Sequence, residues 1–163
     1  MPEPKTEYDY GAYCGLYCGA CAVLLANERG EVEKLLEHEK AAAYTVEQLT
    51  CRGCRTDVVA SFCADCEMRL CASRRGVAFC ADCDDYPCEH VKTFGADKHP
   101  HHSVVLKNLA AIAEGGGEAW LAAQLERWGC PSCGARFTWY DKKCDACGEE
   151  LYDCRAEERD LAA

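Results

Sequence analysis

Cysteine pairs are the residues of this chain whose type and spacing most clearly predict chemistry. Sixteen of the 163 residues are cysteine, and most of them stand in Cys-x-x-Cys pairs. Two intervening residues let both sulfurs of a pair bind one tetrahedral ion. The spacing therefore predicts a protein that binds metal ions. The pairs are Cys18/Cys21, Cys51/Cys54, Cys63/Cys66, Cys80/Cys83, Cys130/Cys133 and Cys144/Cys147.

The last two pairs have the spacing of a zinc ribbon. Ten residues separate Cys133 from Cys144, and a glycine follows the second cysteine of each pair (Gly134 and Gly148). Glycine at this place permits the positive φ that turns backbone N–H groups toward sulfur. Residues 136–140 are rich in aromatic and β-branched side chains, which favour a strand. We expect a structural Zn²⁺ held by Cys130, Cys133, Cys144 and Cys147.

Eight further cysteines lie in the middle of the chain and are enough for two four-cysteine sites. A five-residue sequence, Phe-Cys-Ala-Asp-Cys, occurs at 62–66 and again at 79–83, and each copy is followed by one more cysteine. This repeat predicts a duplicated metal-binding element. The ligands pair either consecutively or in an interleaved arrangement that uses the repeat symmetrically. Consecutive pairing gives Cys51/Cys54/Cys63/Cys66 and Cys71/Cys80/Cys83/Cys88.

The N-terminal motif supplies three cysteines, Cys14, Cys18 and Cys21, whereas a closed tetrahedral site needs four ligands. Either a fourth ligand completes the site, or one position stays open, or one thiol is not a ligand. A closed site is structural, whereas an open position is typical of catalytic zinc. The same three thiols also suit an iron–sulfur cluster or a thiol sensor. The candidate fourth ligands are Cys154, His90 and the cluster His99, His101 and His102, which is also consistent with a solvated linker.

The net charge and the hydropathy of the chain indicate which binding partners and which cellular compartment to expect. The formal net charge is −10, so electrostatic attraction to nucleic acid or to anionic lipid is not expected. The arginines beside the cysteines are expected to offset thiolate charge. No secretory signal is visible, and no apolar run approaches the roughly 18 residues of a membrane span. We therefore expect a cytoplasmic protein whose thiolates bind metal rather than form disulfides.

The elements that must position these cysteines are mainly short helices. Apolar periodicity predicts a helix over 22–44, interrupted at Gly30, and a helical hairpin over 103–113 and 117–128, with Ser103 as an N-cap. The fold class we expect is a small α+β protein stapled by metal, with a C-terminal β zinc ribbon. The expected parts are a Cys-rich domain at 1–95 with its motifs in 11–90, a linker and helical hairpin at 96–129, the ribbon at 130–154 and a charged, frayed tail at 155–163.

Several of these motifs resemble a known family. CGLYCGAC at 14–21, CRGC at 51–54, FCADCEMRLCA at 62–72 and GVAFCADCDDYPC at 76–88 are similar, in this order, to an uncharacterised cysteine-rich prokaryotic family, domain of unknown function 3795. The similarity covers roughly residues 11–95. The later segments HPHHSVVLKNLAAI and AWLAAQLERWGCPSCGARFTWYDKKCDACG resemble the C-terminal extension of longer members. The resemblance implies metal binding, with zinc as the metal, and brings no established reaction.

Three functions are consistent with the sequence. The first is a non-enzymatic zinc protein with about three to four Zn²⁺ ions, whose rigid surface binds a protein partner. A Gly-rich phosphate loop and an H-E-x-x-H motif are both missing from the sequence, which favours this hypothesis. The second is an iron–sulfur carrier or thiol sensor at the N-terminal cysteines. The third is an enzyme with an open zinc site there. Nucleic-acid binding through Arg127, Arg136, Lys142 and Lys143 is disfavoured by the surrounding acids.

Overall fold

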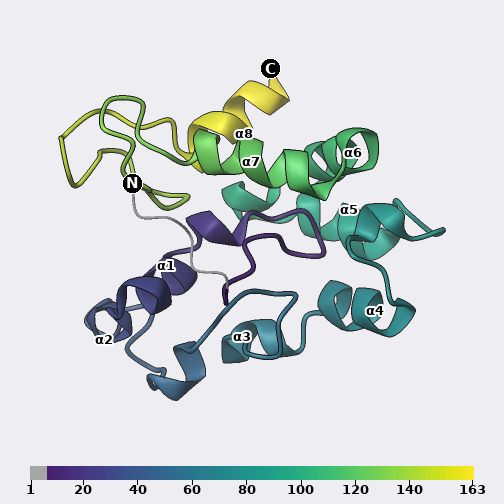
Figure 1. Cartoon of the computed structure of the whole chain (residues 1–163), viewed down its shortest axis with the longest axis horizontal. Coiled ribbons are helices and arrows are strands. Elements are labelled where there is room, and N and C mark those ends of the chain that lie inside the picture. The colour runs from purple at the N-terminus through teal and green to yellow at the C-terminus, as the bar shows by residue number, and fades with distance from the viewer. Residues whose placement is uncertain (1–6) are drawn as a thin grey trace.

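The chain folds into short helices joined by irregular segments (Figure 1). The computed structural model describes residues 7–163. Within this part of the chain, no helix combines the length and the apolar character needed to cross a bilayer. The α-helices are α1 (Ala22–Arg29), α2 (Val32–Leu35), α3 (Ser61–Ala64), α4 (Glu67–Arg75), α5 (Glu89–Gly95), α6 (Val105–Gly115), α7 (Gly117–Arg127) and α8 (Cys154–Ala162). Single 3₁₀ turns are η1 (Cys18–Ala20), η2 (Glu47–Leu49), η3 (Cys80–Asp82) and η4 (Pro100–His102).

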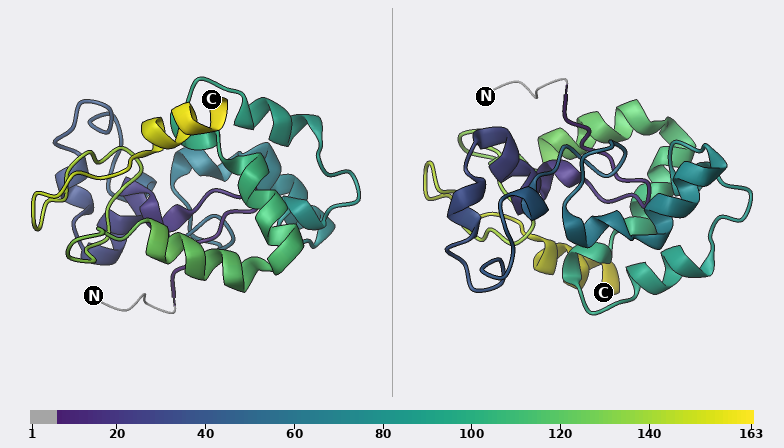
Figure 2. Two further views of the ribbon diagram at one scale, coloured as in Figure 1. Left: turned by 90° about the horizontal axis from the view of Figure 1, so that it is seen from above. Right: turned by 90° about the horizontal axis from the view of Figure 1, so that it is seen from below.

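The N-terminal segment crosses the middle of the molecule. In Figure 1 this purple segment passes between α6, α7 and α8 on one side and α1, α3 and α4 on the other, and Figure 2 shows the same crossing from above and from below. Its backbone turns back on itself, because Gly11 and Tyr17 form an antiparallel bridge and the Ala12 N–H donates to the Leu16 carbonyl at 2.9 Å. The Cys-x-x-x-Cys loop therefore lies at the centre of the fold.

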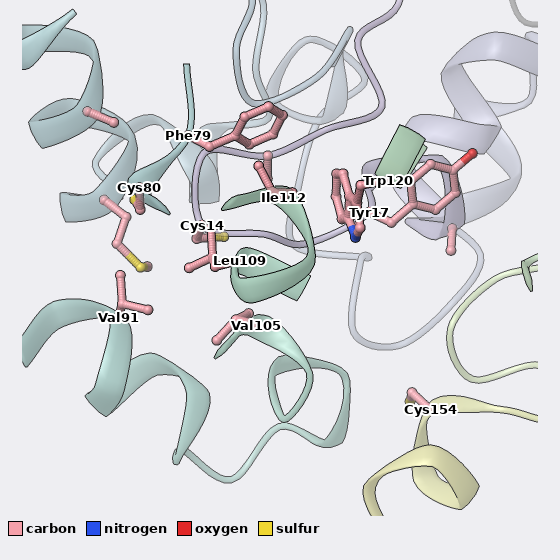
Figure 3. Close-up of a cluster of buried hydrophobic side chains, with 14 of the residues drawn as sticks. Cys14, Tyr17, Phe79, Cys80, Val91, Val105, Leu109, Ile112, Trp120 and Cys154 are labelled. Carbon is pink, nitrogen blue, oxygen red and sulfur yellow. The ribbon is translucent and has the colours of Figure 1, made fainter. Parts of the chain in front are cut away.

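The main core is built around this central loop from α6, α7 and the second copy of the repeat (Figure 3). Leu109 of α6 is fully buried. Trp120 of α7 meets Tyr17 and Phe79 edge to face, with ring centroids 6.3 and 5.9 Å apart. Edge-to-face pairs of this kind stabilise a core beyond the area they bury. The aromatic cluster therefore joins the N-terminal loop to the helical hairpin.

The helical hairpin is present, but its N-terminal cap is not the expected one. The helices α6 and α7 are separated by Gly116. Val104 occupies the N-cap position of α6, and the Ser103 hydroxyl donates to the Pro100 carbonyl at 2.7 Å. Because its hydroxyl closes the preceding turn η4, Ser103 does not cap α6.

The first helical region is shorter than expected. The helix α1 ends before Gly30, as predicted, but α2 stops at Leu35 and residues 36–44 form turns. Residues 37–40 are all exposed, so a helix there would bury no apolar face. Asn27 fixes the end of α1 against the next segment, since its side chain donates to the Leu49 carbonyl at 2.8 Å and accepts from the Cys51 N–H at 3.1 Å.

The expected α+β fold class and its β zinc ribbon are wrong. Among residues 7–163 the β contacts are three isolated bridges, of which Gly129–Arg136 and Lys143–Glu150 fall in the C-terminal part. The run at 136–140 docks onto the rest of the protein instead of forming a hairpin strand. Phe137 is buried against Trp128, with ring centroids 5.3 Å apart, and the Trp139 N–H donates to the Ala20 carbonyl at 3.0 Å.

Most of the charged tail forms a helix with a side-chain cap, α8. Asp153 is the N-cap of α8, and its side chain accepts a hydrogen bond from the Ala156 N–H at 3.0 Å. Arg127 of α7 pairs with Glu157 of α8 at 2.9 Å, and both side chains are largely buried. A side-chain cap and an interhelical ion pair together order a helix whose sequence is mostly charged.

Candidate metal centre

The tightest group of cysteines is the C-terminal tetrad Cys130, Cys133, Cys144 and Cys147, whose four sulfurs all lie within 4.8 Å of one another. The Sγ atoms of Cys130 and Cys147 are 3.6 Å apart, and so are those of Cys133 and Cys144. In a tetrahedral site with metal–sulfur bonds of about 2.3 Å, neighbouring sulfurs are about 3.8 Å apart. The tetrad is therefore already arranged to hold one metal ion.

Two equivalent turns present these four sulfurs. The Gly134 N–H donates to the Cys130 carbonyl and the Gly148 N–H donates to the Cys144 carbonyl, each at 2.8 Å. Both glycines have positive φ, 77° and 80°, as the sequence predicts. The backbone N–H of Cys133 hydrogen-bonds to the Cys130 sulfur and lowers the pKa of this thiol to about 7. The first turn thus favours the thiolate of Cys130, whereas burial and the neighbouring sulfurs raise the pKa of Cys147 to about 12.

The three cysteines of the second repeat copy and Cys71, which follows the first copy, surround a small cavity beside the second copy. Cys71, Cys80, Cys83 and Cys88 all line this space of about 30 Å³, together with apolar side chains. A cavity of this size admits a single ion or one water molecule but no organic ligand. The four residues are those that consecutive pairing predicts as one site, although no three of their sulfurs come as close together as those of the tetrad within the described chain.

Arginine side chains compensate negative charge near some of the thiols. The Arg75 guanidinium donates to the Cys83 sulfur at 3.1 Å and also pairs with Asp85 at 2.8 Å. Arg69 donates to the Cys54 carbonyl at 3.0 Å. Its charge also partly offsets the effect of burial, which raises the pKa of Cys54 to about 11. The expectation that arginines offset thiolate charge thus agrees with the contacts of these two residues.

The N-terminal cysteines lie with those of the CRGC motif and the first repeat copy. Cys14, Cys18, Cys54 and Cys66 pack in the main core, whereas Cys21 and Cys51 pack in a second apolar cluster around Leu24. Cys18 contacts both clusters. Cys63 is close enough to Cys21 and Cys51 that these thiols help to raise its pKa to about 12, after the larger effect of burial. Cys18 thus lies between two subsets of a seven-cysteine group, which Cys80 of the neighbouring cavity approaches through Cys14 and Cys54. The group consists of Cys14, Cys18, Cys21, Cys51, Cys54, Cys63 and Cys66.

Burial makes free thiolates unfavourable in this seven-cysteine group. It is the largest cause that raises the pKa values of Cys14 and Cys18 well above their ordinary range, and the nearby Cys54 raises both further. A cation bound by these sulfurs would stabilise the thiolate form and reverse this effect. The seven-cysteine group is thus suited either to neutral thiols or to thiolates bound to metal. The two states differ in the protonation and charge of the sulfurs.

The third residue of the CRGC motif, Gly53, occupies a position that requires glycine. This glycine has a φ of +124°, and a Cβ atom there would stand 2.0 Å from the Asp9 carbonyl oxygen. The Asp9 N–H donates to the Arg52 carbonyl at 2.8 Å, and the Arg55 guanidinium binds both carboxylate oxygens of Asp9 at 3.0 and 3.1 Å. These contacts fix the turn that carries Cys51 and Cys54 against the N-terminal segment.

The candidates for a fourth ligand of the N-terminal triad lie elsewhere. Figure 3 shows Cys154 well apart from Cys14 and Cys80. His90 lines the cavity of the second repeat copy and pairs with Glu67 at 2.7 Å. His101 stacks on Trp139 and contacts the Tyr140 hydroxyl at 2.6 Å. Instead of these residues, the structure brings the cysteines of the CRGC motif and first repeat copy to the triad.

One candidate metal-binding group was not predicted from the sequence. Asp97, His99 and His102 bring a carboxylate and two imidazole nitrogens within 4.8 Å of one another. The sequence suggests the two histidines as ligands of the cysteine triad, and it assigns no role to Asp97. The spacing Asp-x-His-x-x-His places all three residues on one short loop and is the signal that could have found the group.

All sixteen cysteines are free thiols in the structure. The chain has no significant match among curated proteins or among solved structures. One family model matches residues 10–93. The match includes the N-terminal triad and the eight central cysteines, and it ends before the C-terminal tetrad. Since the matched segment is more than half of the chain, the protein belongs to the family described as protein of unknown function (DUF3795).

Proposed function

We propose that this protein is a zinc-binding, non-enzymatic interaction module whose metal ions hold the fold together. The observation that carries the proposal is the tetrad, in which two sulfur–sulfur separations of 3.6 Å match a tetrahedral four-thiolate ion. Four cysteine ligands close the coordination sphere, and closed sites of this kind are structural. Zinc is the metal that this donor set most often holds in a structural role.

The cavity of the second repeat copy supports a second zinc site. Cys71, Cys80, Cys83 and Cys88 line one ion-sized space, where Arg75 also compensates negative charge. Buried thiols without a cation would remain protonated, since burial is the main cause that raises the pKa of Cys80 to about 12. Together with one or two ions in the seven-cysteine group, the protein would carry about three to four Zn²⁺.

Among the exposed apolar side chains of residues 7–163, Phe62 offers a contact for a protein partner. Phe62, in the first repeat copy, is 52% exposed and meets Tyr44 edge to face at 5.9 Å. The equivalent Phe79 is 5% exposed in the core. An exposed aromatic pair on a metal-stabilised surface suits contact with another protein, and the net charge of −10 favours a partner with basic groups.

Metal analysis of protein purified without oxygen tests this proposal. We expect three to four zinc ions per chain, measured by inductively coupled plasma mass spectrometry. The variant Cys133→Ser should contain one zinc fewer, whereas Cys154→Ala, which removes a buried thiol outside all of these groups, should keep the full number. Wild-type protein that retains no zinc, or a tetrad variant with unchanged zinc, would refute the proposal.

A second candidate function is favoured by the spread of the N-terminal thiols. No three sulfurs of the seven-cysteine group come within 4.8 Å of one another among the described residues, and an iron–sulfur cluster is larger than a single ion. This group would then hold a redox-active cluster while the tetrad holds zinc. Anaerobically purified protein would be brown, and dithionite would bleach its visible absorption. A colourless protein with zinc alone excludes this alternative.

A further inference from the structure

A carboxylate and two imidazoles meet on the loop between α5 and α6. Nδ1 of His102 lies 2.7 Å from one carboxylate oxygen of Asp97, and Nδ1 of His99 lies 3.3 Å from the other. We propose that Asp97, His99 and His102 form a second kind of metal site, which binds an exchangeable first-row divalent ion such as Zn²⁺ or Co²⁺. This site uses no cysteine and is independent of the thiolate sites in the function proposed above.

The loop holds the three ligands in place before any ion binds. The imidazole of His102 stacks on Phe94 with ring centroids 3.7 Å apart, and only 12% of its side chain is exposed. The backbone N–H of His99 donates to the Asp97 carboxylate at 2.9 Å. The turn η4 then carries the chain from His99 to His102. Because these contacts fix the carboxylate and one ring, little conformational freedom is lost when a metal ion binds.

The distances agree with adjacent positions around one ion. Metal bonds of about 2.1 Å to nitrogen and oxygen, at right angles, place neighbouring ligand atoms about 3.0 Å apart. The two separations from Asp97, 2.7 and 3.3 Å, run to different carboxylate oxygens and lie below the separation of about 3.4 Å around a tetrahedral ion, so the ligand atoms would move apart slightly when a tetrahedral ion binds. Two imidazoles and one carboxylate form a donor set for zinc, iron, nickel and copper ions, and three protein ligands leave positions for water or another molecule.

Exposure separates this site from the thiolate sites. The side chain of His99 is 48% exposed and that of Asp97 is 31% exposed, so an ion could enter from solvent. His101 is not one of the three ligands, but its ring packs edge to face on His102 with centroids 4.1 Å apart and stacks on Trp139 at 4.2 Å. The matched control is therefore His38, an exposed histidine outside this loop.

Cobalt titration of the zinc-loaded protein tests the site. Free zinc is removed first, and Co²⁺ is then added while binding is followed by isothermal titration calorimetry and by absorption spectroscopy. We expect one equivalent of Co²⁺ to bind with weak d–d absorption and without the strong sulfur-to-cobalt charge-transfer band. Zinc content measured before and after the titration shows whether the thiolate sites have exchanged.

The variants decide which residues bind the ion. His99→Ala, Asp97→Asn and His102→Ala should each weaken Co²⁺ binding at least tenfold. His38→Ala, which removes an exposed imidazole outside the site, should leave Co²⁺ binding unchanged. If Asp97→Asn or His102→Ala unfolds the loop, His99→Ala still tests the proposal, because its half-exposed ring contributes little to packing. Wild-type protein that binds no added Co²⁺, or His99→Ala with wild-type affinity, would overturn the site and leave the zinc proposal intact.

Discussion

The side-chain amide of Asn108, on α6, donates a hydrogen bond to the backbone carbonyl of Gly15 at 2.8 Å, and this bond is buried. Gly15 lies between Cys14 and Cys18, so α6 holds the cysteine loop through this bond as well as through apolar contacts. A residue of the helical hairpin thus positions the N-terminal candidate ligands from 93 positions further along the chain.

Replacing Asn108 with alanine should destabilise the protein and loosen this loop. The Gly15 carbonyl would lose its partner inside the protein, which costs about 1–3 kcal/mol. Urea unfolding measures this loss, and metal analysis shows whether the N-terminal group still binds its ions. Lys107→Ala, at the exposed neighbouring position, is the control and should unfold at the wild-type urea concentration.

Removing one sulfur of the tetrad should release one ion and unfold only the C-terminal loops. Cys133 is exposed, so Cys133→Ser changes metal ligation with little loss of packing. We expect faster amide exchange over residues 129–151 and near-normal exchange in α6 and α7. Hydrogen exchange followed by mass spectrometry measures both regions. Equal loss of protection in α6 and α7 would contradict the local role of this ion.

The two phenylalanines of the repeat should differ in their contribution to stability. Phe79 is buried against Trp120 and under the Arg55 guanidinium, 4.2 Å from its ring centroid. We expect Phe79→Ala to cost about 3–5 kcal/mol, as for other large residues removed from a core. Phe62→Ala, which is its matched control in an identical five-residue sequence, should cost less than about 1 kcal/mol. Chemical denaturation of both variants gives the comparison.

A buried ion pair joins the tetrad segment to α1. Arg136 binds Glu28 at 2.6 Å, and the side chains are 7% and 8% exposed. Arg136→Ala leaves the buried carboxylate with the Tyr10 hydroxyl but without its charged partner, and should destabilise the protein by up to about 3–5 kcal/mol. The double variant Arg136→Met with Glu28→Leu should lose less free energy of unfolding than the sum of the losses of the two single variants. Zinc at the tetrad should survive both changes, since neither residue is a ligand.

The cap of α8 gives a smaller and more local prediction. Asp153→Ala removes the acceptor for the Ala156 N–H and should cost about 0.5–2 kcal/mol. Asp153→Asn keeps an acceptor at the same position and should recover most of this loss. Thermal unfolding with the metal content held constant measures both. Equal stability of the alanine and asparagine variants would rule out capping as the role of Asp153.

Local spacing made the tetrad and the hairpin predictable. The two Cys-x-x-Cys turns and their glycines depend on a few neighbouring residues, and the structure forms them as expected. The helical hairpin follows from apolar periodicity and a glycine break. Family membership was likewise recognisable, because many motifs occur in one order. The four cysteines that line the cavity are those that consecutive pairing groups together, although their binding of one ion stays a prediction.

Features that depend on distant contacts were not predictable in the same way. The aromatic run at 136–140 has strand propensity, yet Phe137 and Trp139 meet Trp128 and Ala20 and take no strand partner. Apolar periodicity alone predicts that the first helix continues past Leu35. The helix ends there because the following residues have nothing to pack against. The seven-cysteine group also needed the fold, since it unites residues from 14 to 66.

The central position of the N-terminal segment has a consequence for how the protein is made. Ribosomes synthesise the first cysteines long before Trp139 and Arg136, which close over Ala20 and Glu28 from more than 100 positions away. During this interval the thiols of the N-terminal half lack their final cover and are open to oxidation or to the wrong ion. If the N-terminal thiols bind metal as proposed, the order of synthesis makes an early supply of metal as important to the finished protein as the ligands themselves.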